Sequence, residues 1–94
     1  MSTITFSDSQ VAVFRDKAQE EPVAFYVLDS LDGVGFEVVL ASEAGGYYDL
    51  GIRYPFPAPA EVRDEIERLN LEVFGLTADQ ALSLVGRSMF GGAK

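Results

Sequence analysis

The sequence predicts an α+β fold: a three-stranded antiparallel meander packed against helices in two layers, with the order α-β-β-β-α-α. Two observations predict the sheet, namely apolar runs on either side of an Asp-Gly pair and an alternating stretch after a Gly-Gly pair. A third predicts the helices, because capping-box sequences precede apolar residues spaced three and four apart. The 94 residues are expected to form a single domain, residues 1–94, with 91–94 as a frayed tail.

The first helix is predicted to begin after Ser7 and to end near Glu20. Ser7 and Gln10 have the spacing of a capping box, in which the two side chains satisfy backbone N–H groups at the helix start. Pro22 ends the helix, because the residue before a proline avoids helical backbone angles, and the first strand follows.

Val23–Leu28 and Phe36–Ala41 are predicted to pair as a hairpin, because both are rich in β-branched and aromatic residues. Asp32-Gly33 between them is typical of a two-residue type I′ turn. This turn sets four facing pairs: Leu31 with Val34, Asp29 with Phe36, Val27 with Val38, and Phe25 with Leu40. Apart from the aspartate these residues are apolar and predict the core face. The other face is mixed, and either the last helix or a second copy of the chain could cover it.

Tyr47–Tyr54 alternates apolar and polar residues and is predicted to be the third strand. Its apolar residues reach the core face only if the preceding loop has an odd number of residues, because side chains alternate along a strand. A three-residue loop of Ala44, Gly45 and Gly46 pairs Leu40 with Leu50 and Val38 with Ile52. We therefore predict an odd-length loop with a glycine in the left-handed conformation.

Alternate prolines at positions 55, 57 and 59 predict an extended connector into the second helix. The apolar stripe of that helix comprises Val62, Ile66, Leu69 and Val73. Gly75 is typical of the residue that follows a helix end. The last helix is predicted from Ala78 to about Met89, after a second capping box formed by Thr77 and Gln80.

The formal net charge of −8 argues against binding to nucleic acid or to anionic membranes, which both attract lysine and arginine. No basic residue occurs between Lys17 and Arg53, so the meander is predicted to be negative. This acidity suits either a basic partner or solubility alone. The sequence shows no recognisable signal peptide or membrane-spanning run, and a cytoplasmic location is therefore expected.

The sequence contains neither histidine nor cysteine, which removes the commonest general base, the usual nucleophile pairs and the usual zinc ligands. We therefore expect a non-enzymatic protein without a metal or a cofactor. A carboxylate pair such as Asp29 and Asp49 is the remaining catalytic alternative, and it requires one carboxyl group in an apolar pocket. The loop Asp29–Gly33 lacks the spacing of a calcium-binding EF-hand.

Two patterns resemble nucleic-acid-binding families. The segment Phe74–Thr77 joins two predicted helices, as in a helix-turn-helix, and the order α-β-β-β-α resembles that of double-stranded RNA-binding domains. The basic helix start of those RNA-binding domains has no counterpart near Pro59–Asp64, and a recognition helix here would have only Arg87 for phosphates. Direct nucleic-acid binding is therefore not predicted.

The aromatic and acidic residues of the meander and its connector lead to the preferred hypothesis, a binding surface for a basic protein. The candidate residues are Tyr26, Glu37, Glu43, Tyr47, Tyr48, Asp49 and Phe56. The aromatic side chains would anchor the partner and the carboxylates would steer it. The simpler alternative is that two of the tyrosines only cap the sheet edge.

The predicted function is that of a small non-enzymatic inhibitor of the antitoxin, immunity or phage counter-defence type. It would engage a basic protein surface, such as that of a nucleic-acid-binding enzyme. Two alternatives stay open: an assembly subunit that self-associates through the sheet face, for example as a homodimer, and a small carboxylate-dependent enzyme or ligand-binding domain.

Overall fold

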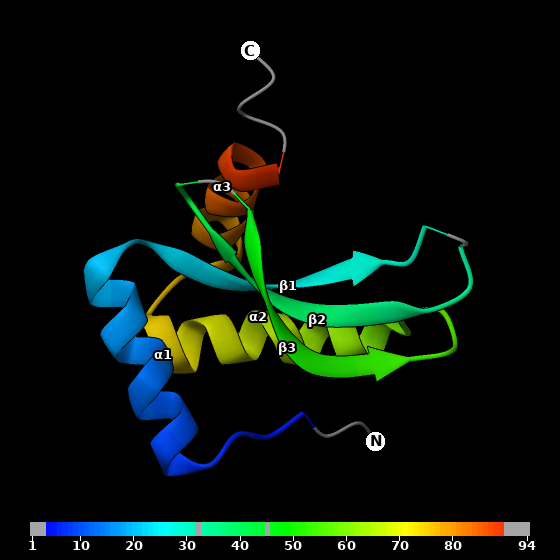
Figure 1. Cartoon of the computed structure of the whole chain (residues 1–94), viewed down its shortest axis with the longest axis horizontal. Helices are drawn as coiled ribbons and strands as arrows, with labels where there is room; N and C mark the ends of the chain where they lie inside the picture. Colours follow the sequence, from blue (N-terminus) through cyan, green and yellow to red (C-terminus); the bar gives the residue numbers. More distant parts are fainter. Residues whose placement is uncertain (1–3, 32, 45, 90–94) are drawn as a thin grey trace.

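An antiparallel sheet with the strand order β1-β2-β3 forms the centre of the molecule, and helices lie around it (Figure 1). The computed structural model describes residues 4–31, 33–44 and 46–89. Its elements are α1 (Asp8–Glu20), β1 (Val23–Asp29), β2 (Phe36–Ser42), β3 (Tyr47–Tyr54), α2 (Ala60–Phe74) and α3 (Ala78–Met89). The predicted α+β class and element order are confirmed. No helix within these ranges is long and apolar enough to cross a membrane.

The helix boundaries follow from local hydrogen bonds that the sequence predicts. The Ser7 N–H donates to Gln10 Oε1 at 2.8 Å and the Gln10 N–H donates to Ser7 Oγ at 3.2 Å, which completes the capping box of α1. Thr77 and Gln80 make the equivalent bonds at the start of α3, at 2.9 and 3.2 Å. Gly75 ends α2 with a φ of 70°, a left-handed conformation that favours glycine.

The β1–β2 register is as predicted, but the turn that joins the strands is not. The confirmed pairs are Asp29 with Phe36, Val27 with Val38, and Phe25 with Leu40. The Gly33 N–H donates to Ser30 O at 2.9 Å, so the turn begins at Ser30 and the predicted type I′ turn is wrong. Leu31 and Val34 were predicted to face each other over the core, and both are exposed at the hairpin tip instead. Asp32 lies outside the described residues.

The β2–β3 pairing contains a β-bulge that the sequence did not predict. Val38 pairs with Ile52 as expected. Leu40 pairs with Tyr48, so its predicted pairing with Leu50 is wrong. The register shifts by two residues between these pairs, and an even shift keeps each side chain of β3 on its original face.

Glycines with positive φ make the bulge and the loop before it possible. Gly51 has a φ of 76°, and its N–H donates to Asp49 Oδ1 at 2.7 Å. In the loop, the Ser42 N–H donates to Gly46 O at 3.2 Å, which encloses the three residues 43–45. The odd length is as predicted, but the loop contains residues 43–45 and not the predicted Ala44, Gly45 and Gly46. Gly46, with a φ of 78°, is the predicted left-handed glycine and lies directly after the loop. Gly45 lies outside the described residues.

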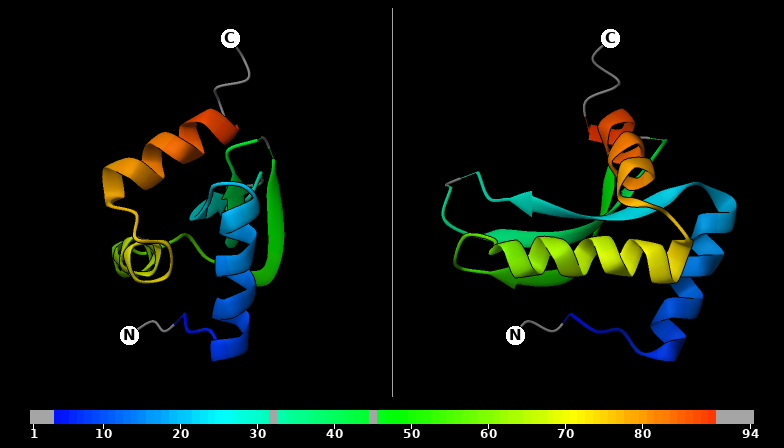
Figure 2. Two further views of the ribbon diagram at one scale, coloured as in Figure 1. Left: turned by 90° about the vertical axis from the view of Figure 1, so that its left-hand side faces the viewer. Right: turned by 180° about the vertical axis from the view of Figure 1, so that it is seen from behind.

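Two hydrophobic clusters cover opposite side-chain faces of the sheet. The larger contains Ile4, Phe14, Val23, Phe25, Val27, Phe36, Val38, Leu40, Val62, Ile66, Leu69 and Val73. The smaller contains Ala24, Ala41, Ala81, Leu84 and Val85. Because successive strand side chains alternate, Ala24 lies on the face opposite Phe25, and α3 therefore covers part of the mixed face. Figure 2 shows α2 running along the sheet and α3 turning away from the end of α2.

Asn70 is a buried polar residue that joins α2 to the outer edge of β1. The Phe25 N–H donates to Asn70 Oδ1 at 2.7 Å, and Asn70 Nδ2 donates to Phe25 O at 3.1 Å. The side-chain amide therefore pairs both backbone groups of Phe25, as a neighbouring strand would if β1 were not at the edge of the sheet. Both residues are at most 3% exposed, so water cannot replace these bonds. The sequence analysis assigned Asn70 no role.

We expect Asn70→Ala to lower the free energy of unfolding by roughly 2–4 kcal/mol, because it leaves a buried N–H and a buried C=O of Phe25 without partners. Urea unfolding followed by circular dichroism measures the change. Leu71→Ala is the matched control, since Leu71 is an exposed neighbour on the same helix and its truncation should cost less than about 0.5 kcal/mol. Similar losses in the two variants would contradict the role assigned to Asn70.

Candidate binding surface

Several different elements hold the predicted binding residues. Tyr48 contacts the residue that caps the end of α1, and Glu37 and Asp49 both contact Arg53. Glu43 lies near α3, and Tyr26 lines a groove beside α2. Phe56 packs on Tyr54. Tyr47 begins β3. The structure therefore assigns these side chains different environments, and each must be judged from its own contacts.

Tyr48 is the centre of a polar cluster at the end of α1, formed with Lys17, Glu21 and Ser42. The Tyr48 hydroxyl donates to Glu21 Oε2 at 2.6 Å, and the Ser42 hydroxyl donates to Glu21 Oε1 at 2.7 Å. Lys17 Nζ lies 4.4 Å from the centroid of the Tyr48 ring, within the range of a cation–π contact. These contacts fit the alternative that a tyrosine caps the sheet edge, although the Tyr48 side chain still contributes exposed surface.

The same hydrogen bonds change the acidity of both partners. Donation from the Tyr48 hydroxyl, and then from the Ser42 hydroxyl, lowers the pKa of Glu21 below its ordinary value. The bond to Glu21 raises the pKa of Tyr48. A deprotonated Tyr48 could not donate this hydrogen bond, and its negative charge would face the Glu21 carboxylate. The cluster is therefore held together best when Glu21 is ionised and Tyr48 is protonated.

Arg53 forms ion pairs with two carboxylates that the sequence analysis assigned to a partner. Arg53 Nε lies 3.2 Å from Glu37 Oε1, and Arg53 Nη2 lies 2.5 Å from Asp49 Oδ2. Lys17 and Arg53 bound the long stretch without basic residues, and both contact the meander in the folded protein. The meander is consequently less negative in space than its sequence suggests.

Tyr47 and Phe56 are the most exposed aromatic residues of the predicted set, at 46% and 47%. The Phe56 ring lies 5.5 Å from the Tyr54 ring and 6.0 Å from the Phe36 ring, measured between centroids. Phe56 therefore shields one end of the core while part of its ring faces solvent. Tyr47 stands next to the β2–β3 loop, where a partner could reach it.

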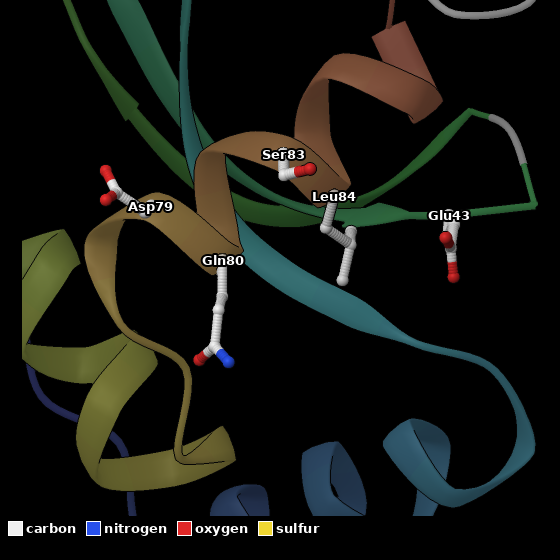
Figure 3. Close-up of a pocket in the computed structure, with 5 residues that line it drawn as sticks. All are labelled: Glu43, Asp79, Gln80, Ser83 and Leu84. Atoms are coloured by element: carbon white, nitrogen blue, oxygen red, sulfur yellow. The ribbon is translucent and has the colours of Figure 1, made fainter.

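Glu43 lines a concavity of about 370 Å³ together with Asp79, Gln80, Ser83 and Leu84. Figure 3 shows that the Asp79 carboxylate points away from the side chains of Glu43 and Ser83. The Gln80 side chain already accepts a hydrogen bond from the Thr77 N–H in the α3 cap. These polar groups do not converge on one point, so the concavity does not form a defined ligand site.

The catalytic alternative finds no support in the positions of its two carboxylates. Asp29 is exposed and lies 3.5 Å from Arg63, whereas Asp49 is exposed and bound to Arg53. Asp49 does line a largely apolar concavity with Phe14 and Ile52, but both carboxyl groups are exposed and paired with arginines, so neither is desolvated as the alternative requires. Over the described part of the chain, no three acidic side chains come close enough to hold a metal ion.

Sequence analysis missed a groove between α2, α3 and the outer edge of β1, which we call the α2–α3 groove. Its volume is about 320 Å³. Buried apolar residues at its base include Val27, Ile66, Ala81 and Val85. Exposed residues at its rim are Arg63, Glu67, Ala78, Asp79 and Leu82. The amphipathic pattern of each helix was visible in the sequence, but their relative position was not.

Tyr48→Phe should make the stability of the protein less sensitive to acid. The folded-state pKa of Glu21 is lowered, so its contribution to stability is present above the ordinary carboxyl value of 4.5 and is lost as pH falls through the lowered folded-state value. Without the Tyr48 hydroxyl the lowering is smaller, and we expect Tm to fall less between about pH 6 and pH 3 than in the wild type.

Thermal unfolding followed by circular dichroism at a series of pH values measures this difference. Tyr47→Phe is the matched control, because Tyr47 neighbours Tyr48 in the same strand and makes no hydrogen bond to Glu21. The control should keep the wild-type pH dependence. An unchanged acid response of Tyr48→Phe would show that the hydroxyl does not stabilise the ionised form of Glu21.

Comparison of the chain with family models, with curated proteins and with solved structures finds no match, so the functional argument depends on the geometry of this surface.

Proposed function

We propose that this protein is a small acidic protein-binding module that covers a basic surface of another protein, as an inhibitor of the antitoxin, immunity or phage counter-defence type does. A nucleic-acid-binding enzyme is the kind of partner that presents such a surface. The observation that supports this proposal best concerns charge: the described cations contact the protein's own groups, whereas several carboxylates face solvent.

Each basic side chain that the structure describes has a partner within the molecule. Arg15 donates to the Glu72 and Val73 carbonyl oxygens, and Lys17 lies over the Tyr48 ring. The other three form ion pairs: Arg53 with Glu37 and Asp49, Arg63 with Asp29, and Arg68 with Glu65 and Glu72. Such contacts hold these side chains against the fold, which makes them less available to an external anion.

Several exposed carboxylates make no ion pair in the described part of the chain. They are Asp8, Asp16 and Glu20 on α1, Glu61, Asp64 and Glu67 on α2, and Asp79 on α3. An approaching protein therefore meets an excess of negative charge. This field accelerates association with a basic surface and disfavours acidic partners.

Exposed apolar side chains supply the short-range contacts that charge alone does not provide. Tyr47, Phe56 and Leu82 are 46%, 47% and 68% exposed. Large side chains that become buried at an interface contribute most of its binding energy, and tyrosine is prominent among them. The proposed activity needs neither a metal nor a cofactor, and the cytoplasm is its proposed location.

Affinity capture from a lysate of the source cells, followed by titration calorimetry with the purified captured protein, tests this proposal. We expect a basic protein in a stoichiometric ratio to the bait. The Kd should weaken at least about tenfold between low salt and roughly 0.3 M salt, because exposed charges are screened. If the captured protein is an enzyme, its activity should fall when the acidic protein is added.

Two outcomes would contradict the proposal. A Kd that does not change with salt would remove its electrostatic basis. Recovery of the bait protein alone, as a species whose mass depends on concentration, would favour the self-associating subunit. The second outcome would also require a surface other than Ala24 and Ala41, because α3 already covers that part of the mixed sheet face.

A further inference from the structure

We propose that the α2–α3 groove binds a basic amphipathic helix of the partner protein. This inference depends on the proposed function and names the part of the surface that performs it. Three properties of the groove favour this occupant: its apolar base, the charge at its rim, and the hydrogen bonds that Asn70 makes to the edge of β1 at Phe25.

The base of the groove is apolar and preformed. Val27, Ile66, Ala81 and Val85 are each 3–6% exposed, so the body of the groove already packs as core. Its volume of about 320 Å³ is at the lower end of the range of small-molecule pockets, roughly 300–1,000 Å³. A groove of this size suits a few apolar side chains presented by a larger partner.

Leu82 extends the apolar surface outward from this base. It lines the groove from α3 and is 68% exposed, the largest exposure among the leucines that the structure describes on helices. Burial of apolar surface is favourable in proportion to its area, and Leu82 has most of its side-chain surface left for an occupant to cover.

The rim of the groove is acidic. Glu67 on α2 and Asp79 on α3 both line it, and neither makes an ion pair with a side chain that the structure describes. Arg63 lies on the same rim but contacts Asp29. Asp64 lies one turn before Glu67 on α2, outside the groove lining, and adds negative charge next to the rim. An occupant with lysine or arginine beside its apolar residues complements this arrangement.

The edge of β1 indicates a helical occupant. A partner that adds a strand to a sheet relies on unpaired backbone groups of the edge strand. At Phe25, which lines the groove, the Asn70 amide already satisfies both the N–H and the C=O. An added strand would have to displace these two hydrogen bonds at Phe25, which favours an occupant that binds through side chains, as a helix does when it lays its apolar face into a groove.

Two synthetic peptides with the same leucine and lysine content test this inference. One has leucines at helical spacing over roughly four turns, and the other alternates leucine and lysine and favours a strand. Fluorescence anisotropy of labelled peptides at low salt should give a Kd at least about tenfold lower for the helical peptide. In two-dimensional NMR, the largest shifts of backbone amides should occur at Ile66, Glu67 and Leu82.

A pair of charge variants separates the groove from general electrostatic attraction. The first is the double variant Glu67→Lys and Asp79→Lys, which reverses two charges at the rim. The second is the double variant Asp8→Lys and Asp16→Lys, which changes the net charge equally but on α1. The controls are matched, because Asp8 and Asp79 both lie in the first turn of a helix and all four carboxylates are exposed. We expect the rim variant to weaken helical-peptide binding at least about tenfold, and the α1 variant by less than about threefold.

Leu82→Ser and Leu71→Ser test the apolar contact without a change in charge. Both leucines are exposed on helices, and only Leu82 lines the groove. Circular dichroism and thermal unfolding confirm that each variant is folded before its affinity is measured. A loss of affinity in Leu82→Ser that is absent in Leu71→Ser supports the groove.

The outcomes distinguish the inference from the function on which it depends. Two results would overturn the inference that the groove binds a helix: an equal loss of helical-peptide affinity in the rim and α1 variants, or equal affinity of the protein for the helical and alternating peptides. Either result would leave the proposed acidic binding module in place. No binding of either basic peptide at low salt would overturn the groove, whereas the salt dependence of the captured partner would still decide the proposed function.

Discussion

The two hydrogen bonds between Asn70 and Phe25 are the contact on which the arrangement of the helices depends. They satisfy the buried N–H and C=O of Phe25 with one planar amide, and this geometry sets the position of α2 along β1 at that residue. α3 follows after the short segment at Gly75, so its place on the opposite face of the sheet is constrained as well. The α2–α3 groove is the space left between these two constrained helices.

The distribution of charge shows why composition alone gives an incomplete description of a surface. A net charge of −8 suggests a uniformly acidic molecule. Folding places Lys17 over Tyr48 and pairs Arg53 of β3 with Glu37 and Asp49, whereas several acids of the helices make no ion pair with a described residue. The negative surface available to a partner therefore lies largely on α1, α2 and the start of α3. The sequence analysis had assigned it to the strands.

Local signals in the sequence predicted most of the fold. The capping boxes, Pro22 and Gly75 each act through neighbouring residues, so the helix boundaries could be inferred without the structure. The register of β1 with β2 followed from the apolar pattern. The position of the hairpin turn and the β3 bulge could not be inferred, because several backbone solutions satisfy the same pattern.

The candidate site was less predictable because its parts are distant in the sequence. Asn70 and Phe25 are 45 positions apart, and nothing local distinguishes that asparagine from a solvated one. Likewise, the charges of Glu37 and Asp49 could be counted from the sequence, but their contacts with Arg53 depend on strand pairing across the bulge. Long-range contacts of this kind decide which acids remain available.

The bulge in β3 has a consequence for how this protein behaves when it is crowded with copies of itself. Gly51 interrupts the outer strand with a left-handed backbone conformation, and its N–H donates a hydrogen bond to the Asp49 side chain. An interrupted edge is a poor template for the stacked strands of amyloid-like fibres. On the opposite edge, Asn70 occupies the outward backbone groups of β1 at Phe25, so each outer strand of the sheet carries an obstacle to sheet-to-sheet growth.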